Sequence, residues 1–192
     1  MNAYSRAVTD QSAFQGPITV ATPDARIMVA GSAPAIYDHY AAHAELVDEI
    51  DLKTDGRYVF VAECPAARDW PSIVVALRYE RSAGGFDPGV AATKSCLFIG
   101  AGNAISCYRR GPDPQKLWTD WVEFGFFGWA IHSDVVVMSA ELELAAWDSE
   151  GHELWTTFVE PPWSYRVEGN QVTLDVMGSI SSFDLVAGPT RQ

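Results

Sequence analysis

The sequence is short of basic residues. Its 192 residues include 13 Lys and Arg against 25 Asp and Glu, which gives a formal net charge of −12 at pH 7. A protein that binds nucleic acid through its overall field needs a basic surface, because it has to neutralise phosphate charges. The composition therefore argues against a nucleic-acid-binding protein, and we expect no nucleic-acid partner.

Long apolar runs and cysteines are also scarce. No run of about 18 apolar residues occurs, so the sequence predicts no membrane-spanning helix. Residues 1–20 contain no apolar run of about seven residues, so we expect no secretory signal. Cys64, Cys96 and Cys107 are too few for a disulfide framework. These absences lead us to expect a cytoplasmic protein with reduced thiols and no membrane partner.

The familiar motifs of catalysis are missing. Neither a G-x-S-x-G nucleophile elbow nor a G-x-x-x-x-G-K-[ST] phosphate-binding loop occurs in the sequence. Residues 100–102 are rich in glycine, but they lie between two strand patterns and precede no helix, which favours a hairpin turn over a phosphate site. We therefore expect no cofactor and assign no catalytic residue.

What the sequence does contain is apolar and aromatic residues in short runs. Of its residues 48% are hydrophobic, and 7 Trp, 7 Tyr and 9 Phe are present, which excludes a disordered chain. Runs of β-branched and aromatic residues are separated by Gly, Asn and Pro. The expected strands are 17–22, 26–30, 58–62, 72–79, 95–99, 104–109, 134–138, 142–147, 152–159, 164–167, 171–176 and 179–185.

We predict a mostly β protein that forms a single domain over residues 1–192. Residues 1–56 are expected to carry the first strands and the one helix, over residues 35–50, with Ser32 as its N-cap. The helix is predicted from apolar residues at intervals of three or four, which would face the core. These residues are Ile36, Tyr40, Ala44 and Val47. Residues 57–192 are expected to form an antiparallel β meander.

An internal repeat with a period of 37 residues supports this meander. Leu117–Glu123 and Leu154–Glu160 share five of seven residues, and the same register aligns Ile99 with Val136. The alignment predicts that both copies are hairpin sheets with equivalent inward-facing positions.

Three segments of the second copy carry a resemblance to a known family. Val135–Met138, Leu144–Asp148 and Glu150–Trp155 resemble the repeat of quinoprotein-type (PQQ-like) β-propellers, in which a short strand precedes an Ala-aromatic-Asp strand, a Gly turn and a Leu-Trp pair. The resemblance spans residues 95–185 at most. It implies propeller-blade-like sheets with tryptophans between them. The first copy departs from the pattern, because residues 109–114 replace the Asp-x-x-Gly turn, and the family's cofactor-binding residues find no match in this chain.

Acidic and aromatic residues gather in the second half of the chain. Residues 113–160 hold ten acidic side chains against Lys116 alone. The aromatic segment Phe124–Trp129 either fills the core or forms an exposed recognition patch. Aromatic anchors surrounded by acidic groups suit a basic protein partner. The candidate binding residues are Trp121, Glu123, Phe126, Trp129, Glu160 and Trp163.

Three functional hypotheses follow from these features. The first is a non-catalytic interaction protein, of an immunity or inhibitor type, that binds a basic protein through residues 118–163. The second is a small-ligand binder that stacks a carbohydrate or another planar ligand on Trp121, Trp129 and Trp163. The third is a metal-dependent enzyme, in which His39 and His43, four residues apart on the predicted helix, share a metal with a third ligand.

Overall fold

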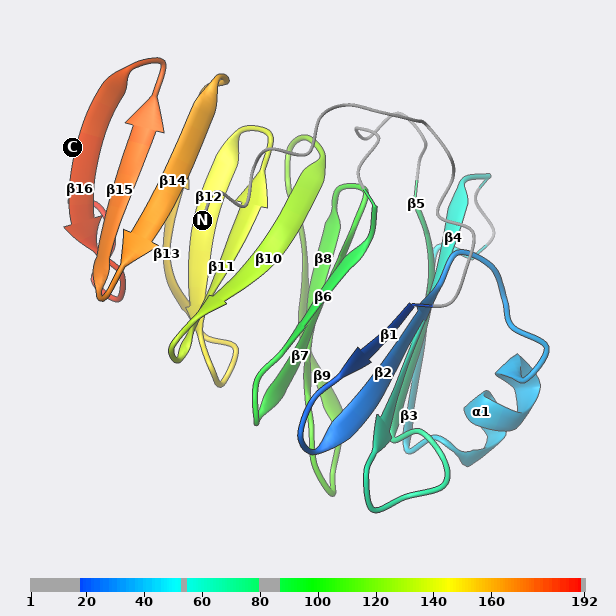
Figure 1. Ribbon diagram of the computed structural model, residues 1–192. Helices are drawn as coiled ribbons and strands as arrows, with labels where there is room; N and C mark the ends of the chain where they lie inside the picture. Colours follow the sequence, from blue (N-terminus) through cyan, green and yellow to red (C-terminus); the bar gives the residue numbers. More distant parts are fainter. Residues whose placement is uncertain (1–17, 53–54, 80–86, 191–192) are drawn as a thin grey trace.

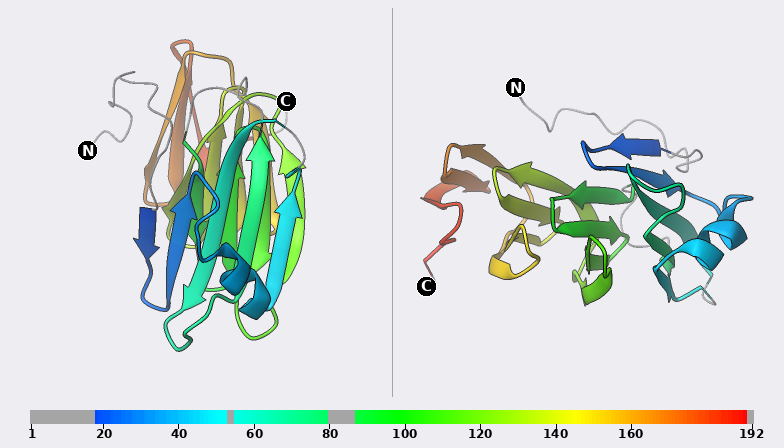
Figure 2. Two further views of the ribbon diagram at one scale, coloured as in Figure 1. Left: turned by 90° about the vertical axis from the view of Figure 1, so that its right-hand side faces the viewer. Right: turned by 90° about the horizontal axis from the view of Figure 1, so that it is seen from below.

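The computed structural model describes residues 18–52, 55–79 and 87–190, and these residues form four β-sheets (Figure 1). The sheets stand side by side in chain order, as is clear when the molecule is seen from below (Figure 2). The prediction of a mostly β protein with blade-like antiparallel sheets and one helix near the N-terminal end is confirmed.

The first sheet has five strands in the order β1-β2-β4-β5-β3. Their bounds are β1 Ile18–Ala21, β2 Ala25–Ala30, β3 Leu46–Ile50, β4 Arg57–Pro65 and β5 Ile73–Tyr79. All of its pairs are antiparallel except β3 with β5, which run parallel from Leu46↔Ile73 to Ile50↔Leu77. This sheet therefore combines β1, β2 and β3 from residues 1–56 with β4 and β5 from residues 57–192.

The second, third and fourth sheets are antiparallel, with their strands in chain order. The second sheet consists of β6 Gly89–Ala92, β7 Cys96–Ala101, β8 Ala104–Arg109 and β9 Gln115–Trp121. The third consists of β10 Phe126–His132, β11 Val135–Ala140, β12 Glu143–Asp148 and β13 Glu153–Phe158. The fourth has β14 Trp163–Glu168, β15 Gln171–Val176 and β16 Ser179–Asp184.

The helix prediction was wrong in its second half. Helix α1 spans only Tyr37–His43, its N-cap is Ile36, and the chain becomes extended at Ala44. Residues 46–50 form β3 instead, where alternate side chains are partly buried. Their apolar residues fit either a helix or a strand, and parallel pairing with the buried strand β5 decides in favour of the strand. Val47, expected in the core, is 40% exposed.

Besides β3, three strands are absent from the expected list. Strand β6 is short and contains Gly89, β9 lies in the first copy of the repeat, and β10 overlaps the aromatic segment Phe124–Trp129. The other strands lie within a few residues of their expected positions. Hairpin turns at Gly102, Gly151 and Gly169 have φ of 63°, 87° and 58°, a conformation that glycine adopts without strain.

Apolar cores fill the space between successive sheets. The first core joins Ile27, Val61 and Val75 of the first sheet to Leu97 and Tyr108 of the second. The second core lies between the second and third sheets, and the third core lies between the third and fourth. The two middle sheets are therefore apolar on both faces, which explains why β7 and β11 are buried at every position.

The outer faces of the first and fourth sheets differ from the faces between sheets. At the first sheet, α1 lies over the outer face (Figure 2), with Tyr37 and Tyr40 packed on Phe60. At the fourth sheet, the strand alternation turns polar side chains outward, and cross-strand neighbours such as Arg166 and Thr173 lie on that face. Within the described residues, a helix thus covers the first sheet, and the fourth sheet presents a mostly polar face.

The two copies of the repeat occupy equivalent places. Trp118 of the second sheet donates from its indole Nε1 to the carbonyl oxygen of Gly151, 2.7 Å away, in the turn after the third strand of the next sheet. Trp155 of the third sheet donates in the same way to Leu185, at 2.8 Å, in the turn after the third strand of the fourth sheet. The tryptophans of the repeat thus connect the second sheet to the third and the third sheet to the fourth.

A buried ion pair takes this role between the first and second sheets. Arg110, in the turn after the third strand of the second sheet, donates from Nε to Glu63 of β4 at 3.0 Å, and their side chains are 4% and 2% exposed. Arg110 also contacts Asp24 at 3.3 Å and the carbonyl oxygen of Thr93, and Glu63 accepts from Ser72 at 2.9 Å. The departure of residues 109–114 from the family pattern therefore has a structural role.

In the described part of the chain, the one helix has seven residues, and no helix is long and apolar enough to cross a membrane.

Candidate functional site: a pocket between the second and third sheets

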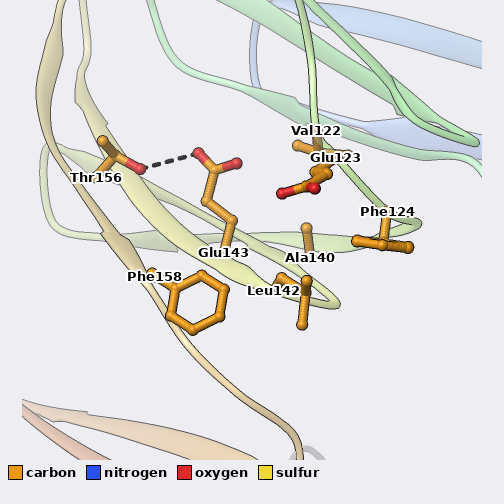
Figure 3. Close-up of a pocket in the computed structure, with 8 residues that line it drawn as sticks. All are labelled: Val122, Glu123, Phe124, Ala140, Leu142, Glu143, Thr156 and Phe158. Atoms are coloured by element: carbon orange, nitrogen blue, oxygen red, sulfur yellow. Dashed lines mark hydrogen bonds between the residues drawn. The ribbon is translucent and has the colours of Figure 1, made fainter.

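A pocket of about 320 Å³ opens where the second sheet ends and the third begins (Figure 3). One wall is the β9–β10 connection, and the other is formed by the end of β11, the start of β12 and the end of β13. Its lining residues are Val122, Glu123, Phe124, Ala140, Leu142, Glu143, Thr156 and Phe158.

Backbone hydrogen bonds hold the β9–β10 connection in place. The N–H of Val122 donates to Asn103 at 2.8 Å, and the N–H of Phe126 donates to Gly102 at 2.7 Å. These two hydrogen bonds attach both ends of the connection to the β7–β8 turn, and the Val122 side chain is buried. The next two residues of the connection, Glu123 and Phe124, line the pocket and are exposed.

The opposite wall is fixed in a similar way. Glu141 donates its N–H to Gly125 of the β9–β10 connection at 3.0 Å, and Val159 donates its N–H to Leu142 at 3.0 Å. These bonds tie the β11–β12 turn both to the connection and to the end of β13. The pocket is therefore framed by a hydrogen-bonded backbone, which restricts the positions of its side chains.

Two carboxylates belong to the pocket. Glu143 is half-buried and accepts a hydrogen bond of 2.9 Å from the hydroxyl of Thr156. Burial raises the pKa of the Glu143 carboxyl, and the negative charges of Asp120 and Glu153 add to this effect. In Figure 3 the exposed side chain of Glu123 is directed toward Glu143. The pocket therefore concentrates negative charge in a partly desolvated place.

Neither carboxylate has a basic partner within the described ranges. No Lys, Arg or His nitrogen there lies within 4.0 Å of Glu123 or Glu143. Basic groups near the second sheet are engaged elsewhere: Lys116 pairs with Asp48 at 2.8 Å, and Arg110 belongs to the buried cluster. The charge of the pocket is thus left uncompensated.

Two phenylalanine rings complete the pocket. Phe124 is 46% exposed and Phe158 is 68% exposed, and they lie on different sides of the two carboxylates (Figure 3). Trp121, at the end of β9, is also exposed, at 53%. Exposed aromatic side chains that gather around a concave site are a feature of binding surfaces.

The structure divides the candidate binding residues into two groups. Glu123 lines the pocket, and Trp121 precedes its wall; Glu160 is exposed just beyond the end of β13. Phe126, by contrast, is 1% exposed, and it lies in the second core together with Trp129. The aromatic segment is therefore divided, since Phe124 is exposed while Phe126 and Trp129 pack in the second core.

Trp163 has a partly buried place between sheets. Its indole Nε1 donates to the carbonyl oxygen of Glu141 at 2.9 Å, and its ring stacks on Phe127 and Tyr165 with ring centroids 6.4 Å away in both cases. Of the three tryptophans proposed to stack a planar ligand, Trp121 is exposed, whereas Trp129 and Trp163 are partly buried.

Sequence analysis did not select Glu143, Thr156 or Phe158 for this site. Glu143 alternates with Leu142 and Leu144, a pattern typical of a solvated strand face. Glu143 shares the β12 face of Ala145 and Trp147, which packs against the second sheet, and this packing between distant segments leaves no signal in the sequence of β12 itself. The exposed Phe158 aligns with Trp121 in the repeat, and this alignment could have indicated it.

The two histidines of α1 have other contacts. Nδ1 of His43 lies 2.7 Å from the carbonyl oxygen of His39, and the His43 ring stacks on Trp70 with centroids 4.3 Å apart. Among the residues that the structure describes, no group of three or more His, Cys, Asp or Glu side chains could hold a metal ion. The three cysteines are buried and free.

Comparisons with known proteins give structural similarities alone. No family model and no curated protein matches the chain. Among solved structures, it is similar to the designed Ika8 protein, with 13% identity and a TM-score of 0.43 over 89% of this chain and 58% of that one. It is also similar to BamB from Moraxella catarrhalis, with 13% identity and a TM-score of 0.44 over 73% of this chain and 46% of that one.

A third similar structure is the designed Ika4 protein, with 20% identity and a TM-score of 0.40 over 54% of this chain and 69% of that one. BamB is a PQQ-like β-propeller protein, and the designed proteins are β-propellers. The chain spans less than half the length of BamB. The blade-like arrangement described above rests on the strand pairing of this chain itself.

Proposed function

We propose that this chain is a non-catalytic binding protein, and that it docks a basic protein partner on the surface around the pocket between the second and third sheets. The observation that carries the proposal is the pair of pocket carboxylates, Glu123 and Glu143, which have no basic counter-ion among the described residues. An immunity-type or inhibitor-type role against a basic protein is its most concrete form.

The surrounding charge supports the proposal. Asp120 and Glu153 act on Glu143 from β9 and β13, so the negative potential extends beyond the pocket. A strongly negative surface speeds up the encounter with a basic partner and disfavours an acidic one. The exposed rings of Trp121 and Phe158 add the aromatic area that interface centres use.

Titration calorimetry with a short oligolysine peptide tests the proposal without knowledge of the natural partner. The double variant Glu123→Gln/Glu143→Gln should bind the peptide at least about tenfold more weakly than the parent protein. Its matched control is Asp38→Asn/Asp69→Asn, which removes the same charge from exposed positions beside the first sheet. Equal weakening in both variants would mean that the peptide senses only net charge, and this result would overturn the proposal.

A further inference from the structure

We infer that the pocket receives one basic side chain of the partner, with its cationic group at Glu143 and Glu123 and its aliphatic stem along the apolar lining. This inference rests on the proposed function and specifies its chemistry. The cation is an alkylammonium group, as in lysine, or a guanidinium group, as in arginine.

The size of the pocket agrees with a single side chain. Its volume of about 320 Å³ lies at the lower end of the range of roughly 300–1,000 Å³ that holds small-molecule ligands. The walls are tied together by backbone hydrogen bonds, so a larger occupant would have to separate the β9–β10 connection from the β11–β12 turn. A slender group that enters end-on fits this space.

The polar atoms of the pocket require a donor. A carboxylate offers about four acceptor sites, and the Thr156 hydroxyl uses one site on Glu143. Glu123 adds a second carboxylate. Asp120 and Glu153 make an anionic ligand unfavourable at this place. A cation with several N–H donors satisfies the free acceptor sites and compensates the charge.

The apolar residues of the pocket distinguish a basic side chain from a bare metal ion. Val122, Ala140 and Leu142 line the pocket, and they offer no side-chain ligand to a metal. Lysine and arginine bury their methylene groups on such surfaces while the charged group reaches polar partners. Phe124 and Phe158 also provide ring faces for cation–π contact, in which arginine is frequent.

Because it is partly buried, this contact should contribute more to binding affinity than a surface ion pair. An exposed ion pair contributes little to affinity because water screens it. Glu143 is already half-buried in the free protein, and a partner that covers the pocket would reduce the local dielectric further. One basic residue of the partner should therefore dominate the interface.

Methyl and aromatic NMR titrations with small probes test the inference directly. n-Butylammonium and n-butylguanidinium should shift the resonances of Leu142, Thr156 and Phe158 in a saturable manner, and whichever binds more tightly identifies the cation. n-Butanol and butyrate should cause little change. The shifts should disappear in Glu143→Gln. Equal shifts with n-butanol, or cation-induced shifts spread over the whole acidic surface, would overturn the inference.

Pocket-filling separates this inference from the proposed function. Leu142→Phe adds volume in the pocket and keeps every charge, so it should weaken oligolysine binding at least about tenfold. If removal of the two carboxylates weakens binding while Leu142→Phe does not, the partner is basic but no side chain enters the pocket. If neither variant differs from Asp38→Asn/Asp69→Asn, the proposed function itself fails.

Phe158→Ser provides a second test of occupancy if Leu142→Phe does not fold, because the exposed Phe158 ring is not needed for the core. It removes an aromatic wall and leaves both carboxylates in place. Thermal melting of each variant shows that the fold is retained. Unchanged oligolysine affinity in a folded Phe158→Ser protein would contradict contact between the stem and this ring.

Discussion

Trp118 and Trp155 lie 37 residues apart in the sequence and make the same contact in two successive sheets. Each indole Nε1 donates to a backbone carbonyl oxygen in the turn that follows the third strand of the next sheet, at 2.7 and 2.8 Å. Each is carried by the fourth strand of its sheet.

Replacement of either tryptophan should destabilise the protein. Trp155→Phe removes the indole donor and leaves the buried carbonyl oxygen of Leu185 unpaired, which costs roughly 1–3 kcal/mol of unfolding free energy. Trp118→Phe should act in the same direction. Trp121→Phe is the control, since its ring is exposed, and should change stability by less than about 0.5 kcal/mol. Urea unfolding measures all three; an equal loss in the control would contradict the role of the indole bond.

Gly188 and Gly178 form a matched pair that tests how Trp155 packs against the chain that follows β16. Both have positive φ, 75° and 85°, so alanine is strained in either place. A Cβ at Gly188 would lie 2.4 Å from Cγ of Trp155, whereas a Cβ at Gly178 would meet nothing within 4 Å. Gly188→Ala should therefore cost about 1–3 kcal/mol more than Gly178→Ala. Equal melting temperatures for the two variants would show that Trp155 does not pack as described.

The buried pair of Arg110 and Glu63 should matter more as a pair than as single charges. Arg110→Met leaves Glu63 buried without its cation and should cost about 3–5 kcal/mol, while Arg110→Met/Glu63→Leu should recover much of that loss. Denaturant unfolding of the two single variants and the double variant gives the coupling between them. Additive losses in the double variant would show that the two side chains do not interact.

Glu143 should reduce stability at neutral pH. Its folded-state pKa is raised above the ordinary value of 4.5, chiefly by burial. The folded protein then binds more protons than the unfolded chain between these two pKa values, so stability decreases as the pH rises through this window. Glu143→Gln should raise the melting temperature at pH 7 and leave it unchanged below the ordinary pKa. A lower melting temperature at pH 7 would show that the charge stabilises the fold.

The same substitution should weaken binding of a basic peptide. The carboxylate that lowers stability is the group expected to hold the cation, so Glu143→Gln should produce a more stable but weaker binder. Binding of oligolysine by the parent protein should also decrease as the pH falls through the raised pKa of Glu143. Glu123, Asp120 and Glu153 surround this group and contribute to the same negative potential.

Most strands could be predicted from the sequence because each is a short apolar run that ends in a turn. The helix prediction was wrong over residues 46–50 because five residues with apolar side chains at both ends fit a helix as well as a strand. What decides between the two is β5, which begins 27 positions later at Ile73. Pairing between distant segments leaves no periodic signal within either segment.

The aromatic strand β10 shows a second limit of sequence analysis. Its side chains contact both neighbouring sheets. Phe126 and Trp129 pack toward the second sheet, and Phe127 stacks on Trp163 of the fourth. A strand that is apolar on both faces lacks the alternation by which strands are detected. Glu123 could be proposed from its acidic and aromatic neighbours, whereas the burial of Glu143 depends on packing against the second sheet, which precedes β12 in the chain.

The most direct test of a basic partner at this pocket is an NMR footprint of oligolysine on the whole protein. We predict that the largest backbone shifts fall on residues 122–124, 140–143 and 156–158, and that Glu123→Gln/Glu143→Gln abolishes them. Largest shifts at α1 or on the outer face of the fourth sheet, or shifts distributed evenly over the acidic surface, would contradict the account.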